Sequence, residues 1–370
     1  MRRFEYNDKN IDGSQFLVAV TATGIGIVIL VFQRELADVT VAADGLFLIL
    51  AGGGIASILI WLMAKFASTF RQQTFFNFTA SVLSKPIAVI ICFLYAIHYI
   101  LLAAYEVRKL TDITQHYLLE ETPMEVLALA FLLVVMYAVS GSRAGIFRLN
   151  AMFMPFVLVI SLAIMIFNIQ LIETSNLLPV FKTSASDNFK GLFMMIAIFI
   201  VGGVGVVLFY SSLVESNTKL SKLAVAGTGV PVLLFFLFYF VAIGVFGNNV
   251  TGNLLYASVE LGKAVEIPGG VLERFESIFF VIWIMTIFNL SVMITDISVV
   301  ALQSIFKNVK KIHFLFMLTP IIFFISMLPH NVEEIGLFGK GLAFSILIFS
   351  LVILPILFIV SKIRGGKADE

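Results

Sequence analysis

The chain has 370 residues, of which 60% are apolar and 13% are charged, and its mean hydropathy is +1.05. A soluble domain of this length is about half apolar and about one-quarter charged, so the composition indicates a membrane protein whose surface faces lipid. The formal net charge of +1 gives no sign of a nucleic-acid partner, and the one cysteine, Cys92, excludes an internal disulfide and a cysteine-based zinc site.

Ten apolar stretches have about the length that a helix needs to cross a bilayer, which is roughly 20 residues. The first follows a mixed-charge start and is too long for the apolar core of a signal peptide, so we interpret it as a retained span. The sequence therefore predicts an all-α membrane protein, with residues 1–370 forming a single transmembrane bundle. The predicted spans are 14–33, 41–65, 86–116, 124–140, 146–170, 190–213, 222–247, 271–305, 312–328 and 338–362.

The basic residues predict the orientation of these spans. If the N-terminus is cytoplasmic, sixteen Lys and Arg residues fall in the inside segments and eight in the outside segments. Cytoplasmic loops are enriched in Lys and Arg, so we expect the N- and C-termini to be cytoplasmic.

Span one has two glycines in its middle, Gly24 and Gly26. A spacing of two does not form a helix-packing face, but it weakens the helix. A break there would expose backbone N–H groups at the start of a half-helix, and a carboxylate of a bound molecule is a suitable partner for such an end. Alternatively, these small residues let a neighbouring helix approach closely.

Span six has three glycines within four positions, Gly202, Gly203 and Gly205. They also favour a break, whose carbonyls could accept hydrogen bonds from an ammonium group, although packing could again explain them. Breaks in the first and sixth of ten spans are typical of a five-plus-five inverted repeat with a binding site at the bilayer midplane. The repeats would cover residues 1–170 and 190–363.

Polar residues within spans three and eight are further candidates, because such groups face the bundle interior or water. Thr286 and Asn289 are three residues apart and share a helix face. Glu106 is expected near the outer interface beside Arg108 and Lys109, and the roles of His98 and Asp296 stay open, with Asp296 the better candidate for an interior role. The remaining candidates are Tyr99, Tyr105, Ser291 and Thr295.

Motifs of catalysis are missing from the sequence. It contains no phosphate-binding loop of the Walker type, no HExxH and no GxSxG. We therefore expect no enzymatic activity, no metal site and no cofactor.

Several stretches resemble the B subunit of spore germinant receptors, the GerAB-like family, within the amino acid–polyamine–cation permease superfamily. The resemblance covers almost the whole chain. The residues that carry it are Glu273, Arg274 and Glu276 followed by Trp283; Arg148, Leu149 and Asn150 with Pro155; residues 176–180 (NLLPV); and Val245, Phe246 and Gly247.

The resemblance implies a LeuT-type fold and a nutrient-sensing subunit in the inner membrane of a bacterial spore. Such a subunit binds a small nutrient, often an amino acid, and works with an A subunit and a C-subunit lipoprotein. The ligand-contacting positions that it implies are Thr23, Gly24, Ile25, Gly26, Tyr99, Leu102, Gly202, Gly203, Gly205, Thr286 and Asn289.

Two other functions stay open on sequence grounds. A secondary amino acid transporter could use the same fold, since fold does not decide function. Span five lacks the interior lysine that some transporting relatives use in place of sodium, which weakens this reading. A structural or ion-conducting subunit, whose glycines serve packing alone, is the third possibility.

Overall fold

The computed structural model describes residues 11–26, 28–70, 73–214, 220–264 and 275–363. Ten apolar helical segments follow one another in these ranges, and two shorter helices lie between them along the chain: α4 (Phe75–Val82) and α10 (Ala257–Lys263). The segments are α1 (Gly13–Ile25) with α2 (Val28–Val39), α3 (Asp44–Thr69), α5 (Lys85–Tyr117), α6 (Met124–Ser140), α7 (Arg143–Asn168), α8 (Ala185–Tyr210), α9 (Leu220–Asn253), α11 (Phe275–Ile305), α12 (Lys311–Ser326), and α13 (Val332–Ile348) with α14 (Leu354–Ile363).

These segments match the ten predicted spans one for one. Seven helices are long and apolar enough to cross a membrane, and the bent pair α1–α2 makes an eighth. The other two, α6 and α12, are apolar but shorter, with 17 and 16 residues. The all-α prediction is confirmed for the part of the chain that the structure describes, although Glu273 and Arg274 of the family-like stretch lie outside it.

Side-chain caps fix several helix starts in the way that the sequence dictates. The side chains of Asp12, Ser142, Ser184 and Asn331 each accept a hydrogen bond from a backbone N–H of the first turn. Such caps satisfy donors that would otherwise have no intrahelical partner.

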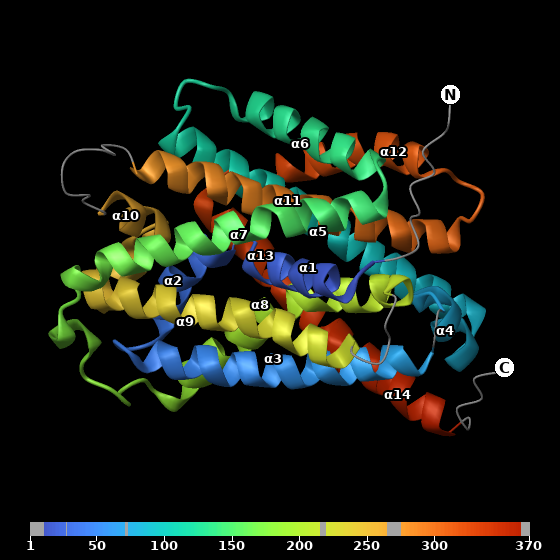
Figure 1. Ribbon diagram of the computed structural model, residues 1–370, viewed down its shortest axis with the longest axis horizontal. Helices are drawn as coiled ribbons and strands as arrows, with labels where there is room; N and C mark the ends of the chain where they lie inside the picture. Colours follow the sequence, from blue (N-terminus) through green and yellow to red (C-terminus); the bar gives the residue numbers. More distant parts are fainter. Residues whose placement is uncertain (1–10, 27, 71–72, 215–219, 265–274, 364–370) are drawn as a thin grey trace.

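Most spans run roughly along the long axis of the molecule, whereas the span made by α13 and α14 crosses obliquely behind them (Figure 1). In α8 and α11, 78% of the most apolar 18-residue stretch is buried inside the molecule, compared with 28% of that stretch in the last span. The edge helices carry large exposed apolar residues such as Phe316, Phe344 and Ile359, as expected for a surface that faces lipid.

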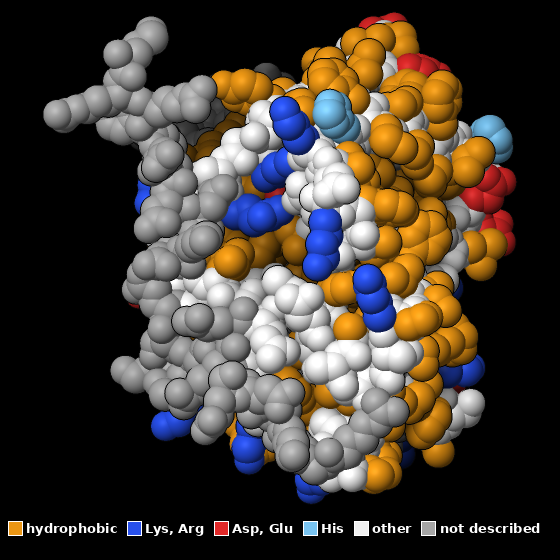
Figure 2. All heavy atoms as spheres, turned by 90° about the vertical axis from the view of Figure 1, so that its right-hand side faces the viewer, with side chains coloured by type: hydrophobic (Ala, Val, Ile, Leu, Met, Phe, Trp, Pro, Cys, Tyr) orange, Lys and Arg blue, Asp and Glu red, His pale blue; other side chains and the backbone are white. Residues whose placement is uncertain are grey.

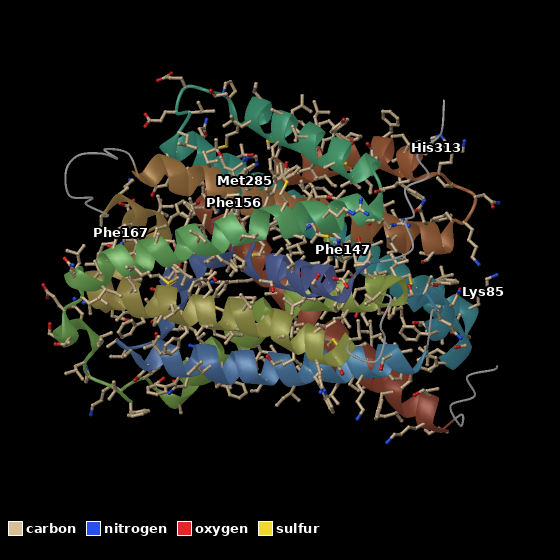
Figure 3. All side chains as sticks on the ribbon, in the orientation of Figure 1. Lys85, Phe147, Phe156, Phe167, Met285 and His313 are labelled. Carbon is tan, nitrogen blue, oxygen red and sulfur yellow. The ribbon has the colours of Figure 1, made fainter. Side chains whose placement is uncertain are left out.

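The helix starts at Gly13 and Lys311 and the helix ends at Thr69 and Ile363 share one end of the bundle with α4 (Figure 1). Lys85 and His313 lie at this end, and Phe167 lies at the opposite one (Figure 3). Lys and Arg side chains are spread over the end that carries Lys85 and His313 (Figure 2). We name it the basic end, and we name the opposite one the outer end after the predicted orientation. The first described helix begins and the last one ends at the basic end.

Close backbone contact holds α3 against α8. A Cβ atom added at Gly52 would lie 2.5 Å from the Cβ of Met195 and 3.1 Å from the backbone nitrogen of Ile196. Neither atom can move without shifting α8, so α3 and α8 can keep this spacing because residue 52 lacks a side chain. Two positions further along α3, a Cβ added at Gly54 would have no other atom of the described chain within 4 Å.

We expect Gly52→Ala to destabilise the protein by about 1–3 kcal/mol, because the added methyl group forces α3 away from α8. Gly54→Ala is the matched control and should be neutral or stabilise by up to about 1 kcal/mol, since alanine favours helix and has room there. Thermal unfolding of the detergent-purified variants measures both effects. Equal unfolding temperatures for the two variants would contradict the packing described here.

Candidate functional site

The first span is interrupted where its glycines predicted. The helix α1 ends at Ile25, Gly26 has φ +38° and ψ −149°, and α2 continues at an angle of 48°. The backbone conformation at Gly26 disfavours any residue with a side chain, and a Cβ atom there would also displace the end of the Leu290 side chain on α11. The N–H groups of the first turn of an α-helix have no acceptor within that helix, so the start of α2 is a place where a bound molecule could accept hydrogen bonds.

A cavity of about 110 Å³ opens beside this break, between α1–α2, α5, α8, α11 and α13. Four predicted site residues line it: Thr23, Gly24, Gly26 and Leu102. From α8 the side chains of Ile198 and Val201 reach the cavity, and Leu290 closes it on α11, so its inner part is apolar. The cavity therefore combines a helix break with a mostly apolar wall, as small-molecule sites commonly do.

Two predicted residues lie on the other side of the break. Ile25 and Thr286 line a separate cavity of about 20 Å³, together with Trp283 and Ser258. That volume has room for little more than one water molecule. Asn289 is fully buried at the next turn of α11 and lines neither cavity.

The predicted break at Gly202–Gly205 is wrong at that position, because α8 stays helical from Ala185 to Tyr210. The three glycines instead let three neighbours approach. A Cβ atom at Gly202 would lie 2.5 Å from Cα of Gly24, and one at Gly203 would lie 2.5 Å from Cδ1 of Ile60. At Gly205 it would collide with the Tyr99 hydroxyl group, so Tyr99 packs against α8 outside the main cavity.

The hydroxyl group of Thr23 joins the two helices directly. Its Oγ1 lies 2.6 Å from the carbonyl oxygen of Gly202, to which it donates, and 2.9 Å from the carbonyl oxygen of Ala19 in its own helix. Thr23 thus fixes α1 on α8 beside the cavity.

Ionisable groups line the part of the cavity nearer the outer end, and the sequence alone did not place them there. Glu106 lies in the wall, 1% exposed, with no hydrogen-bond partner for its Oε2 atom among the residues that the structure describes. It does not lie at the outer interface, as its neighbours Arg108 and Lys109 had suggested. Glu106 is four residues after Leu102 and therefore on the same face of α5, which could have predicted from the sequence that both residues line the cavity. Tyr105, Glu35 and Lys340 also line this part.

Comparison with known proteins identifies the family. A model of the spore germination protein family matches residues 10–335. The chain belongs to the spore germination protein family. It is 40% identical to the spore germination protein GerLB of Bacillus cereus over 99% of both chains, and 26% identical to YndE of Bacillus subtilis (strain 168) over 92% of this chain and 93% of that one. The predicted resemblance is confirmed.

Solved structures confirm the LeuT-type fold of this spore germination protein. Mhp1, a nucleobase-cation-symport-1 family transporter with bromovinylhydantoin bound, matches with a TM-score of 0.63 and 14% identity, over 94% of this chain and 80% of its own. MhsT in complex with L-phenylalanine matches with a TM-score of 0.63 and 15% identity, over 90% of this chain and 88% of its own. At these identities the likeness concerns the fold.

At the outer end, α10 fastens α2 in this germination protein. The Ser258 hydroxyl group donates to the carbonyl oxygen of Ile29, at the start of α2, with an O···O distance of 2.8 Å. Just before α10, the Tyr256 hydroxyl group donates to Oδ2 of Asp112 on α5 at 2.7 Å. Burial, and then the nearby Asp112 carboxylate, raise the pKa of Tyr256, so its hydroxyl group stays protonated and keeps donating.

At the basic end, Asp296 joins three other helices. Its fully buried carboxylate lies 2.8 Å from Nζ of Lys311 on α12 and 3.4 Å from Nε of Arg143 on α7. The Tyr210 hydroxyl group on α8 donates to Oδ2 at 2.6 Å. We call these four residues the Asp296 cluster. It gives Asp296 the interior role that its place in span eight favoured, but that role is to join helices, because none of the four residues lines the cavity beside Gly26.

Proposed function

We propose that this protein is the nutrient-sensing subunit of a spore germinant receptor and that it binds a small amino acid in the cavity beside Gly26. The observation that carries the proposal is the meeting of a helix break, a buried acid and an apolar wall in one cavity of about 110 Å³. The two polar features suit the two charged groups of an amino acid.

The start of α2 offers partial positive charge and free N–H groups to the ligand carboxylate. The Glu106 carboxyl group, which has a hydrogen-bonding position to spare, accepts from the ligand ammonium group. Leu102, Ile198 and Val201 then contact an apolar side chain. L-phenylalanine bound to MhsT, a protein of the same fold, supports this ligand class.

The eleven positions predicted from the sequence divide into three groups in this proposal. Thr23, Gly24, Gly26 and Leu102 contact the ligand. Ile25 and Thr286 lie behind the break, and the others shape the surrounding helices: Tyr99, Gly202, Gly203, Gly205 and Asn289.

Signalling requires that the ligand bind two conformations with different affinity. We infer that the ligand draws α1–α2 towards α5 and that the Asp296 cluster holds the basic end while this happens. An A subunit and a C-subunit lipoprotein would read the change in the spore inner membrane, with both termini on the core side. This movement would take place within the first of the two proposed five-helix repeats, residues 1–170, while the second, residues 190–363, supplies the opposite wall of the cavity.

We expect Gly26→Val to abolish amino acid binding, because valine disfavours the φ of +38° and collides with Leu290. A saturating ligand that binds the folded state alone raises apparent stability by about 2.7 kcal/mol at 100 times its Kd. A thermal-shift screen of amino acids on the purified chain should show this rise for wild type and not for the variant. Spores that carry the variant should assemble the receptor and fail to respond to the nutrient.

Gly229→Val is the matched control, because a Cβ atom at Gly229 would have no other described atom within 4 Å. This variant should keep the rise in unfolding temperature that the amino acid ligand causes in wild type. An unaltered shift in Gly26→Val would refute binding at the break, and the absence of any amino acid shift in wild type would refute the proposed ligand class.

Replacement of Glu106 with glutamine should weaken binding of amino acids by about 10- to 100-fold, as loss of a charge-assisted hydrogen bond worth roughly 1.5–3 kcal/mol predicts. Binding of the corresponding carboxylic acid without its amino group should change much less. Isothermal titration of both ligands against both proteins measures the difference. Equal losses for the two ligands would show that Glu106 does not contact the amino group.

Transport is the alternative use of the same cavity. We expect the purified chain in proteoliposomes to bind labelled amino acid without concentrating it, because α7 carries no lysine within the bilayer. Robust concentrative uptake by the chain alone would favour a transporter over a sensor.

A further inference from the structure

An apolar groove lies on the lipid-facing surface between α3 and the last span, near the basic end. Its volume is about 260 Å³, and its walls are Leu59, Leu62 and Phe66 from α3 and Leu354, Pro355 and Phe358 from α14. It is separate from the cavity beside Gly26, with which it shares no residue.

A small residue at a distorted turn leaves room for the groove. Phe349–Ile353 forms a π-helical turn between α13 and α14, and Ser350 in this turn is the smallest side chain that lines the groove. The neighbouring residues of the turn are Phe, Leu, Val and Ile. Within a bilayer, a groove of this kind is filled by hydrocarbon, because an empty one forfeits dispersion contacts along its walls.

Two lysines lie at the basic end of the helices that wall the groove. Lys362 follows Phe358 by one turn, and its Nζ lies 4.9 Å from the centre of the Phe358 ring. Lys65 is next to Phe66, and its Nζ lies 4.7 Å from the centre of the Trp61 ring. Phe66 and Phe358 contact each other, with ring centroids 5.9 Å apart, so the two helices meet beside both lysines.

Neither lysine forms an ion pair within the part of the chain that the structure describes. Both are exposed, and residues 45–70 and 335–363 contain no Asp or Glu that could neutralise them. Positive charge at the level of the headgroups, beside a groove for hydrocarbon, matches an anionic lipid. A partner helix would match the groove but would leave the two cations unexplained.

We propose that this groove binds one anionic glycerophospholipid of the leaflet at the basic end, with an acyl chain in the groove and the phosphate between Lys65 and Lys362. The two Nζ atoms lie over the rings of Trp61 and Phe358, one turn earlier in each helix. A lysine side chain can extend from such a position towards the headgroup layer while its stem stays in the apolar region, and this would bring both ammonium groups to one phosphate.

Native mass spectrometry of the delipidated full-length chain, titrated with phosphatidylglycerol or phosphatidylcholine of equal chain length, tests the proposal. Wild type should bind one phosphatidylglycerol more tightly than phosphatidylcholine. The double variant Lys65→Gln/Lys362→Gln should bind phosphatidylglycerol roughly 10- to 30-fold more weakly, from about 1 kcal/mol per lysine, and should lose the preference. The control variant Lys307→Gln/Lys310→Gln removes the same amount of charge at the same end and should keep the preference for phosphatidylglycerol.

A second variant tests the groove itself. Ser350→Leu adds an apolar side chain to its wall and should remove the tight phosphatidylglycerol adduct while both lysines remain. The proposal is overturned if Lys65→Gln/Lys362→Gln keeps the wild-type preference, or if the control variant loses it equally. It is also overturned if Ser350→Leu leaves lipid binding unchanged but releases another receptor subunit from the purified complex, because the groove would then be a protein interface.

Discussion

At Gly24 and Gly202, α1 and α8 touch backbone to backbone, and no side chain fits between them. The Thr23 hydroxyl group adds a hydrogen bond to the Gly202 carbonyl oxygen across the same contact. Interhelical contacts in lipid depend on such close packing and on polar bonds, because the hydrocarbon provides no hydrophobic drive between helices. This contact holds the end of α1 in place while α2 departs from it, and so it positions the break and the cavity.

Most of the fold follows from composition and periodicity. Apolar runs such as 41–65 and 190–213 have to cross the bilayer as helices, since lipid offers no partner for backbone N–H and C=O groups. The break in span one was also predictable, because Gly24 and Gly26 lie too close together for a packing face. The same reasoning misplaced a break in α8, where Gly202, Gly203 and Gly205 face Gly24, Ile60 and Tyr99. A glycine that makes room for a neighbouring helix and a glycine that ends its own helix cannot be told apart from the sequence alone. The structure of the neighbouring helix determines which of the two roles the glycine has.

Most of the main cavity was not predictable from the sequence. Of the predicted ligand-contacting residues, Thr23, Gly24, Gly26 and Leu102 line the cavity. Glu35 and Lys340 come from segments distant in the chain and reach it through the packing of α2 and α13. Glu106 looked like part of a surface charge cluster because Arg108 and Lys109 follow it. Its burial depends on which face of α5 turns towards α8 and α13. An acid buried in a span is costly, and such residues usually serve a ligand or an ion.

The positive φ of Gly26 also limits how this gene can vary. Every single-base change that replaces a glycine codon with that of another amino acid introduces a residue that carries a Cβ atom, and at this position that atom meets both an unfavourable backbone conformation and Leu290. Single-base changes that replace Gly26 with another amino acid are therefore expected to disrupt the helix break. If the cavity binds the proposed ligand, a change of ligand preference would have to arise in the surrounding wall, at positions such as Ile198 and Val201, which lie on α8 and not at the helix break.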